Sequence, residues 1–160
     1  MSLTIPSPLI SSLHFAPASA DDFDDLLALR IEAMRDSLER IERFDPERAR
    51  LRFLAGFAPD ATRYIVQNGE RIGFIVVKSD AADLLLDHLY IRPAAQGKGI
   101  GTLVLQQLFA QADAEGRVVR VGALRESASN RFYQRHGFAL VSSGEFDRYY
   151  VRAARRPHQD

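Results

Sequence analysis

The sequence contains no cysteine, which excludes disulfide bonds, thiolate metal sites and a cysteine nucleophile. It has no excess charge either, because 21 Lys and Arg residues balance 21 Asp and Glu residues. Such a balance gives no sign of a nucleic-acid or anionic-membrane partner. No apolar run approaches the roughly 20 residues of a membrane-spanning helix, and the N-terminal residues lack a secretion signal. We therefore expect a cytoplasmic protein. The isolated His14, His136 and His158 have no metal-ligand spacing, so no metal site is expected.

The length of 160 residues fits one domain, and 46% of the residues are hydrophobic. No repeat, low-complexity tract or linker divides the chain. We expect a loose N-terminal arm at residues 1–12, one domain at 13–152 and a C-terminal tail at 153–160.

Two helix starts are predicted in the first third of the chain. Ser19 followed by Asp22 has the spacing of a capping box. Asp45 followed by Pro46 suits a helix cap and a first helical residue, and this second helix is expected to include residues 49–54. The arginines at positions 48, 50 and 52 cannot share one helical face and are interpreted as solvated surface. The residues behind Ser19 with helical spacing are Phe23, Leu26, Leu27, Arg30, Ile31, Met34 and Leu38.

The rest of the chain alternates between strand and helix patterns. Asn68-Gly69 is a strong two-residue hairpin signal between two apolar runs, and Gly116 follows a long helical pattern where a left-handed cap belongs. This order predicts a mixed α/β sheet. The expected strands are residues 63–67, 72–78, 83–91, 118–123, 138–142 and 146–151, and the expected helices are residues 99–115 and 129–136.

A glycine-rich loop at residues 96–102 lies between a predicted strand and a predicted helix. Glycines 97, 99 and 101 allow close approach of the backbone to a ligand, and the amides of residues 97–102 can point into one concavity. With the helix N-terminus behind them, these amides suit a pyrophosphate. The loop is neither a P-loop, which needs Lys after the last Gly, nor the dinucleotide fingerprint G-x-G-x-x-G. A plain tight connection is the structural alternative.

Two segments at matching spacing resemble the GNAT N-acetyltransferases. Residues 96–101 (QGKGIG) resemble the family's Q/R-x-x-G-x-G/A signature, and residues 130–138 (NRFYQRHGF) resemble its N-x-x-x-Y-x-x-x-G-F segment. Residues 86–91 resemble the family's fourth strand, and the likeness extends over about residues 13–151. It implies a central, mostly antiparallel sheet whose fourth and fifth strands are parallel and splay apart, with helices on its faces.

The resemblance also implies the cosubstrate, acetyl-CoA, and its contacts. Backbone groups of the fourth strand would pair with the pantetheine arm, the loop amides would hold the pyrophosphate, and Gln96 and Lys98 would add donors at the rim. The residues implied to bind acetyl-CoA are Leu89, Tyr90, Ile91, Gln96, Gly97, Lys98, Gly99, Ile100, Gly101, Thr102, Asn130 and Tyr133.

The implied reaction is direct attack of an amine on the thioester in a ternary complex. Tyr133 is the expected general acid for the departing thiolate, and its structural alternative is an aromatic at the edge of the core. The candidate bases are Glu32, Asp87 and His88. Asp87 and His88 are neighbours on a strand, so they cannot both reach one cleft unless a bulge intervenes.

The acceptor is expected to be a small-molecule or peptide amine, and the resemblance makes a homodimer one of the expected assemblies. Residues 31–35 and 44–46 lie where the family shapes its acceptor pocket, and alternation directs only one of Tyr149 and Tyr150 toward it. Three hypotheses stay open: an active acetyltransferase, a non-catalytic module of the same fold that binds acyl-CoA, and an unrelated α/β domain with a fortuitous glycine loop.

Overall fold

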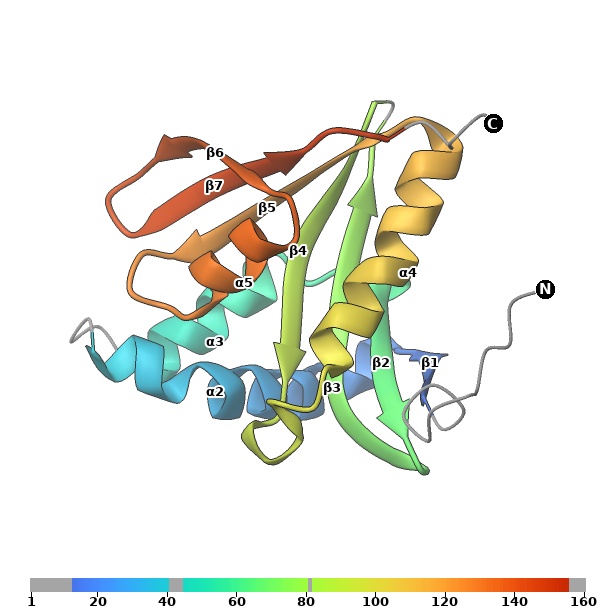
Figure 1. Cartoon of the computed structure of the whole chain (residues 1–160). Coiled ribbons are helices and arrows are strands. Elements are labelled where there is room, and N and C mark those ends of the chain that lie inside the picture. Colours follow the sequence, from blue (N-terminus) through green and yellow to red (C-terminus); the bar gives the residue numbers. More distant parts are fainter. Residues whose placement is uncertain (1–12, 41–44, 81, 156–160) are drawn as a thin grey trace.

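A seven-stranded mixed sheet with helices on both faces forms the framework of the protein (Figure 1). The computed structural model describes residues 13–40, 45–80 and 82–155. The strands are β1 (Leu13–Pro17), β2 (Thr62–Gln67), β3 (Glu70–Ser79), β4 (Asp83–Ile91), β5 (Val118–Leu124), β6 (Ala139–Ser143) and β7 (Asp147–Arg152). The helices are α2 (Phe23–Arg40), α3 (Pro46–Ala55), α4 (Ile100–Glu115) and α5 (Ser129–Arg135), with short 3₁₀ turns at η1 (Ala20–Asp22), η2 (Pro59–Ala61) and η3 (Pro93–Ala95).

The strand order is β1-β2-β3-β4-β5-β7-β6, and β4 with β5 is the parallel pair among otherwise antiparallel neighbours. This parallel pair is joined through α4, as a crossover connection requires. The mixed sheet and the parallel pairing of the fourth and fifth strands agree with the fold predicted from the sequence.

Two hydrophobic cores lie on the two faces of the sheet, because side chains alternate along each strand. On β3, Ile75 belongs to the core beneath α4 and α5. Its neighbours Phe74 and Val76 belong to the core beneath α2 and α3. In Figure 1, α4 and α5 lie in front of the sheet.

The turn and cap signals of the sequence appear as predicted. The Asp22 carboxylate accepts a hydrogen bond from the Ser19 backbone N–H at 2.8 Å. Asp45 caps α3 by accepting from the backbone N–H groups of the first turn. Asn68 and Gly69 have φ angles of 52° and 78°, which is the positive-φ pair that a tight hairpin requires. Gly116 ends α4 with a φ of 66°.

The strand β1 was not predicted from the sequence. It pairs antiparallel with β2 from Leu13 opposite Gln67 to Pro17 opposite Arg63. Its hydrogen-bonding partner is a segment about 50 residues away, so the residues next to β1 in the sequence do not predict the strand. The predicted arm at residues 1–12 and most of the predicted tail lie outside the described residues. Among the described helices, none is long and apolar enough to cross a membrane.

Gly73→Ala should destabilise the protein, because a Cβ at this position of β3 would overlap the Tyr90 carbonyl oxygen of β4. The backbone would have to shift, and we expect a loss of about 1–3 kcal/mol in the free energy of unfolding, measured by urea denaturation. Gly56→Ala is the control, because its added Cβ would meet the nearest atom, Lys78 Nζ, at 3.9 Å. Equal stabilities of the two variants would contradict this packing.

Candidate functional site

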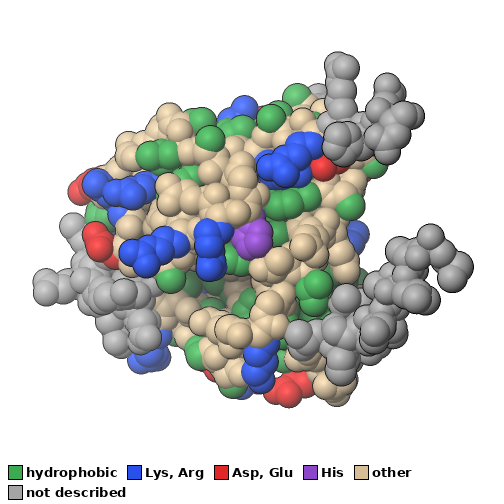
Figure 2. Space-filling view, viewed as in Figure 1, with side chains coloured by type: hydrophobic (Ala, Val, Ile, Leu, Met, Phe, Trp, Pro, Cys, Tyr) green, Lys and Arg blue, Asp and Glu red, His purple; other side chains and the backbone are tan. Residues whose placement is uncertain are grey.

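The cleft of the molecule lies where β4 and β5 separate. Their pairing extends from Asp83 opposite Val118 to Leu86 opposite Val121 and then stops, although both strands continue. A cleft of about 1300 Å³ opens beyond this point, with walls from β4, the glycine-rich loop, β5 and α5. Figure 2 shows this face hollowed, with apolar side chains in the depth of the hollow and Lys and Arg side chains beside it.

The free edge of β4 faces this cleft. The Arg92 backbone N–H donates to the Ile72 carbonyl at 2.7 Å, so by the alternation of an antiparallel ladder His88 and Tyr90 also bond to β3. The N–H and C=O groups of Leu89 and Ile91 therefore point away from β3, toward the gap left by β5. The Gln96 side chain donates to the Ile91 carbonyl at 2.8 Å. Gln96 thus fixes the loop to the strand end.

The glycine-rich loop presents backbone rather than side chains to the cleft. Gly97 and Gly99 have φ angles of 77° and 80°, and a Cβ on either residue would meet no atom within 4 Å. Gly99 is the N-cap of α4 and has no side chain to bond the first amides of that helix. Uncapped amides and the positive end of the helix dipole can bind an anion here. The neighbouring Lys98 is exposed and does not line the cleft.

The start of α4 packs directly on α5. A Cβ on Gly101 would lie 3.0 Å from the Phe132 ring, so a larger residue here would require the ring to shift. Thr102 Oγ1 lies within hydrogen-bonding distance, 3.1 Å, of His136 Nε2. The loop and α5 are therefore held together as one wall of the cleft.

Asn130 is buried, and its side chain holds α5 to the end of β5 and to β7 through hydrogen bonds. Its amide nitrogen donates to the Leu124 carbonyl at 2.7 Å and to the Ser127 carbonyl at 2.9 Å. Its amide oxygen accepts from the Tyr150 hydroxyl at 2.7 Å. Asn130 does not line the cleft, so the ligand contact implied by the resemblance would require one of these bonds to be exchanged.

Tyr133, one turn further along α5, is buried and lines the cleft. Burial raises the pKa of its phenol above the ordinary value, and the nearby Tyr90 adds to this effect. The phenol is protonated at neutral pH, as an ordinary tyrosine is, and its raised pKa makes it a weaker acid than a free tyrosine.

A bulge in β4 brings Asp87 and His88 to the same cleft. The register with β3 changes from Val76 opposite His88 to Val77 opposite Leu86, which leaves Asp87 as the extra residue. Both side chains line the cleft, with Asp87 Oδ2 3.7 Å from His88 Nε2. From the sequence, Asp87 and His88 can reach the same cleft only if a bulge intervenes, and the structure contains this bulge.

His88 is held neutral by its surroundings. Burial lowers its pKa from 6.5 to about 4, against an opposing effect of Asp87. Its ring packs edge-on against Phe53 with 5.4 Å between centroids. Its Nδ1 lies 3.0 Å from the Tyr90 hydroxyl. The lowered pKa leaves the imidazole neutral near pH 7, and it also makes His88 a weaker base than a free histidine.

The structure does not bring Glu32 to this pair. Glu32 is exposed, contacts Arg92 at 3.4 Å and does not line the cleft. The side chains that α2 and α3 contribute to the cleft wall are Arg30, Ala33, Met34 and Arg52.

Two arginines of this wall were not predicted as site residues. Arg52, interpreted as solvated surface, is exposed but also lines the cleft. Arg30 was grouped with the helical-spacing residues of its helix, and a charge on an otherwise apolar stripe was the signal that could have identified it. On β7, Tyr150 is buried toward α5, whereas Tyr149 is exposed. The Tyr149 ring lies over Gly122, where an added Cβ would be 3.3 Å from it.

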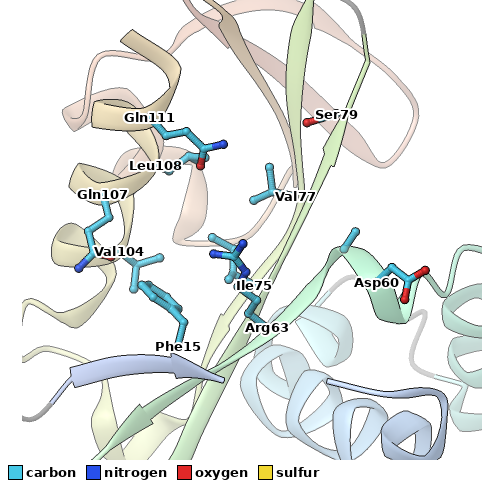
Figure 3. Close-up of a pocket in the computed structure, with 11 residues that line it drawn as sticks. Phe15, Asp60, Arg63, Ile75, Val77, Ser79, Val104, Gln107, Leu108 and Gln111 are labelled. Carbon is cyan, nitrogen blue, oxygen red and sulfur yellow. The ribbon is translucent and has the colours of Figure 1, made fainter. Parts of the chain in front are cut away.

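A second hollow of about 250 Å³ lies between α4 and strands β1 to β3 (Figure 3). Phe15, Ile75 and Val104 provide apolar surface, and Arg63 and Gln107 provide polar groups. None of the residues predicted to bind or react lines this hollow, so the larger cleft is the candidate site.

Comparisons with known proteins identify the family and the fold. The family model described as "Acetyltransferase (GNAT) domain" matches residues 59–140. No curated protein matches the sequence significantly. The fold is similar to the PaiA N-acetyltransferase of Thermoplasma acidophilum in complex with coenzyme A, with a TM-score of 0.68, 20% identity and coverage of 89% of this chain and 99% of that one. It is also similar to an acetyltransferase of Thermus thermophilus (TM-score 0.68, 22% identity, coverage 89% and 97%). Ard1 of Thermoplasma volcanium gives a TM-score of 0.63 at 16% identity, with coverage of 91% and 99%.

The lowered pKa of His88 should make stability depend on pH. The unfolded chain gains a proton on this residue below about pH 6.5, whereas the folded protein does so only near pH 4. Stability is therefore lost as the pH falls through this window. His88→Gln should lose less stability than the wild type between pH 7 and pH 4 in urea denaturation, with the exposed His14→Gln as the control. A His88 imidazole that titrates near 6.5 by NMR would contradict its burial.

Proposed function

Since the chain belongs to the GNAT family of acetyltransferases, whose domain model covers just over half of it, we propose that it transfers the acetyl group of acetyl-CoA to a primary amine. The observation that carries the proposal is the convergence of three features on one cleft: the uncapped N-terminus of α4, the free edge of β4, and the pair formed by Tyr133 and His88. The family match removes the hypothesis of an unrelated α/β domain.

Acetyl-CoA would bind along the splay between β4 and β5. The amides of residues 97–102 fit its pyrophosphate, because positive-φ glycines and a helix N-terminus form an anion site without side chains. The backbone groups of Leu89 and the N–H of Ile91 are free to pair with the pantetheine arm as an added strand would. The neighbour from Thermoplasma acidophilum, which is in complex with coenzyme A, supports this assignment.

The acetyl transfer would proceed by direct attack in a ternary complex. His88, neutral and beside Asp87, accepts a proton from the ammonium of the acceptor. The amine nitrogen then bonds to the thioester carbon as the C–S bond breaks, and a backbone N–H near Leu89 stabilises the charge on the carbonyl oxygen. Tyr133 protonates the departing thiolate, and the proton that the nitrogen loses as the amide forms restores the phenol. A thiol with a pKa of about 8.5 leaves readily, so this proton transfer assists the reaction without being essential.

Several features expected from the sequence stay predictions: the cytoplasmic location, a homodimer, and the acid role of Tyr133. A non-catalytic module that binds acyl-CoA is the alternative function. It differs from the enzyme in one measurable property, the release of free CoA in the presence of an amine.

Gly99→Val should weaken acetyl-CoA binding at least about tenfold, because a branched side chain at φ 80° displaces the amides that face the pyrophosphate. Calorimetric titration measures this loss. Gly116→Val is the matched control, since it introduces comparable strain at φ 66° at the opposite end of the same helix. The control should lose similar stability and keep its affinity for acetyl-CoA. Equal affinities of the two variants would indicate that the loop is only a tight connection.

Tyr133→Phe should lower kcat about 100-fold, at the low end of the effect of a general acid, because the thiolate is a good leaving group. Thiol release is measured with a panel of amines: free amino acids, polyamines, aminoglycosides and peptides with free N-termini. Tyr64→Phe is the control, because Tyr64 bonds Asp25 outside the cleft. An unchanged kcat in Tyr133→Phe would refute the acid role. Acetyl-CoA binding with no turnover of any amine would support the non-catalytic module.

A further inference from the structure

Arg30 of α2 is a charged side chain in the cleft wall whose guanidinium interacts with Tyr90. Its Nε and Nη1 atoms are buried and have no hydrogen-bond partner. Burying part of a cation without a partner is unfavourable, and native proteins rarely do so unless the group serves a ligand. These two atoms are covered by the protein, so the feature that marks Arg30 as a binding group is a cation in the cleft wall without a carboxylate partner.

The carboxylates around Arg30 do not neutralise it. Asp87 forms an ion pair with Lys78 at 3.0 Å, and Glu32 contacts Arg92 at 3.4 Å. Asp147 lines the cleft from β7 but forms no ion pair with Arg30. Among the described residues, no carboxylate lies within ion-pair distance of the Arg30 guanidinium.

The wall formed by α2 and α3 has a single sign of charge. Its lining residues are two cations, Arg30 and Arg52, and two apolar residues, Ala33 and Met34. The strand β4, on which these helices pack, contributes the carboxylate of Asp87 and the neutral His88. Groups suited to an ammonium and groups suited to an anion thus line neighbouring parts of the cleft.

Tyr90 links these two parts of the cleft. Its hydroxyl lies 3.0 Å from His88 Nδ1, and the Arg30 guanidinium carbon lies 5.9 Å from the centroid of its ring. His88 and Arg30 therefore both contact the side chain of Tyr90, one at its hydroxyl and the other near its ring. Amines with an anionic group a few bonds away match this arrangement, whereas polyamines have a second positive charge there.

We propose that Arg30 determines acceptor specificity by binding the carboxylate of the acceptor, and that the acceptors are free amino acids or similar small amines that carry a carboxylate. A guanidinium can donate two parallel N–H hydrogen bonds to the two oxygens of a carboxylate. The partial burial of this guanidinium strengthens the ion pair, because the local dielectric constant is low. The inference rests on the proposed acetyl transfer for its reaction and on the cleft wall for its ligand.

The test compares free amino acids with the corresponding amino acid amides, which keep the amine and lack the negative charge. The wild type should acetylate the free acids with the lower KM. Arg30→Met should raise the KM for the free acids about 10- to 100-fold, the usual effect of losing hydrogen bonds to a charged group. The KM for the amides should change less than about twofold. Arg30→Lys should fall between, because lysine keeps the charge and loses the two parallel N–H donors.

Stability separates a binding role from a structural one. Methionine in place of a partly buried, unpaired arginine should leave the thermal midpoint unchanged or raise it, and a structural role would lower it. Arg48→Met, an exposed arginine of α3 outside the cleft, is the control and should change neither KM nor stability. If Arg30→Met does not fold, Arg30→Lys provides the same comparison.

Binding of a free amino acid to the CoA-saturated protein, measured by calorimetry, does not depend on turnover. Binding that is weakened by Arg30→Met without any acetylation would support the anion site and refute the acetyl transfer. Acetylation of acids and amides with equal KM by the wild type, or an equal effect of Arg30→Met on both, would overturn the role of Arg30 and leave the acetyl transfer standing.

Discussion

The extra residue in β4 is the constraint on which the rest of the cleft depends. Because Asp87 stands outside the register with β3, Leu86 and Leu89 face the same side of the sheet even though three positions separate them. His88 and Tyr90 then face α2 and α3, where they pack with Phe74. The pairing with β5 ends one residue before the bulge. A local change in backbone register thus lies where the two strands separate, and it directs His88 toward α2 and α3.

The features that could be predicted from the sequence are those in which one residue type meets a local backbone requirement. Asn68 and Gly69 adopt positive φ, Asp45 caps a helix, and Gly97 and Gly99 form a left-handed loop. Such requirements are visible in a few adjacent residues. The strand β1, the bulge at Asp87 and the exposure of Arg30 to the cleft depend on contacts between distant segments, and no adjacent residues encode them. For that reason the fold was predictable and the acceptor side of the cleft was not.

Motif positions proved easier to predict than the parts that their side chains play. Gln96 and Asn130 both belong to the segments that resemble the family, and both were expected to contact the ligand. In the structure their amides bond to the protein, Gln96 to the end of β4 and Asn130 to the end of β5 and to Tyr150. Each amide joins two segments that would otherwise be free to separate at the mouth of the cleft. These hydrogen bonds within the protein give both motif residues a structural part, and their contacts with the ligand stay predictions.

The contact between Gly101 and Phe132 has a consequence for how such a sequence can change over time. A side chain at position 101 would press on the Phe132 ring, which is carried by the same short helix as Tyr133. A larger residue at 101 requires the Phe132 ring to shift or to be replaced by a smaller side chain, so a change at one position alters what the other position can accept. The glycine-rich loop and α5 can therefore diverge in sequence less independently than their separation along the chain suggests.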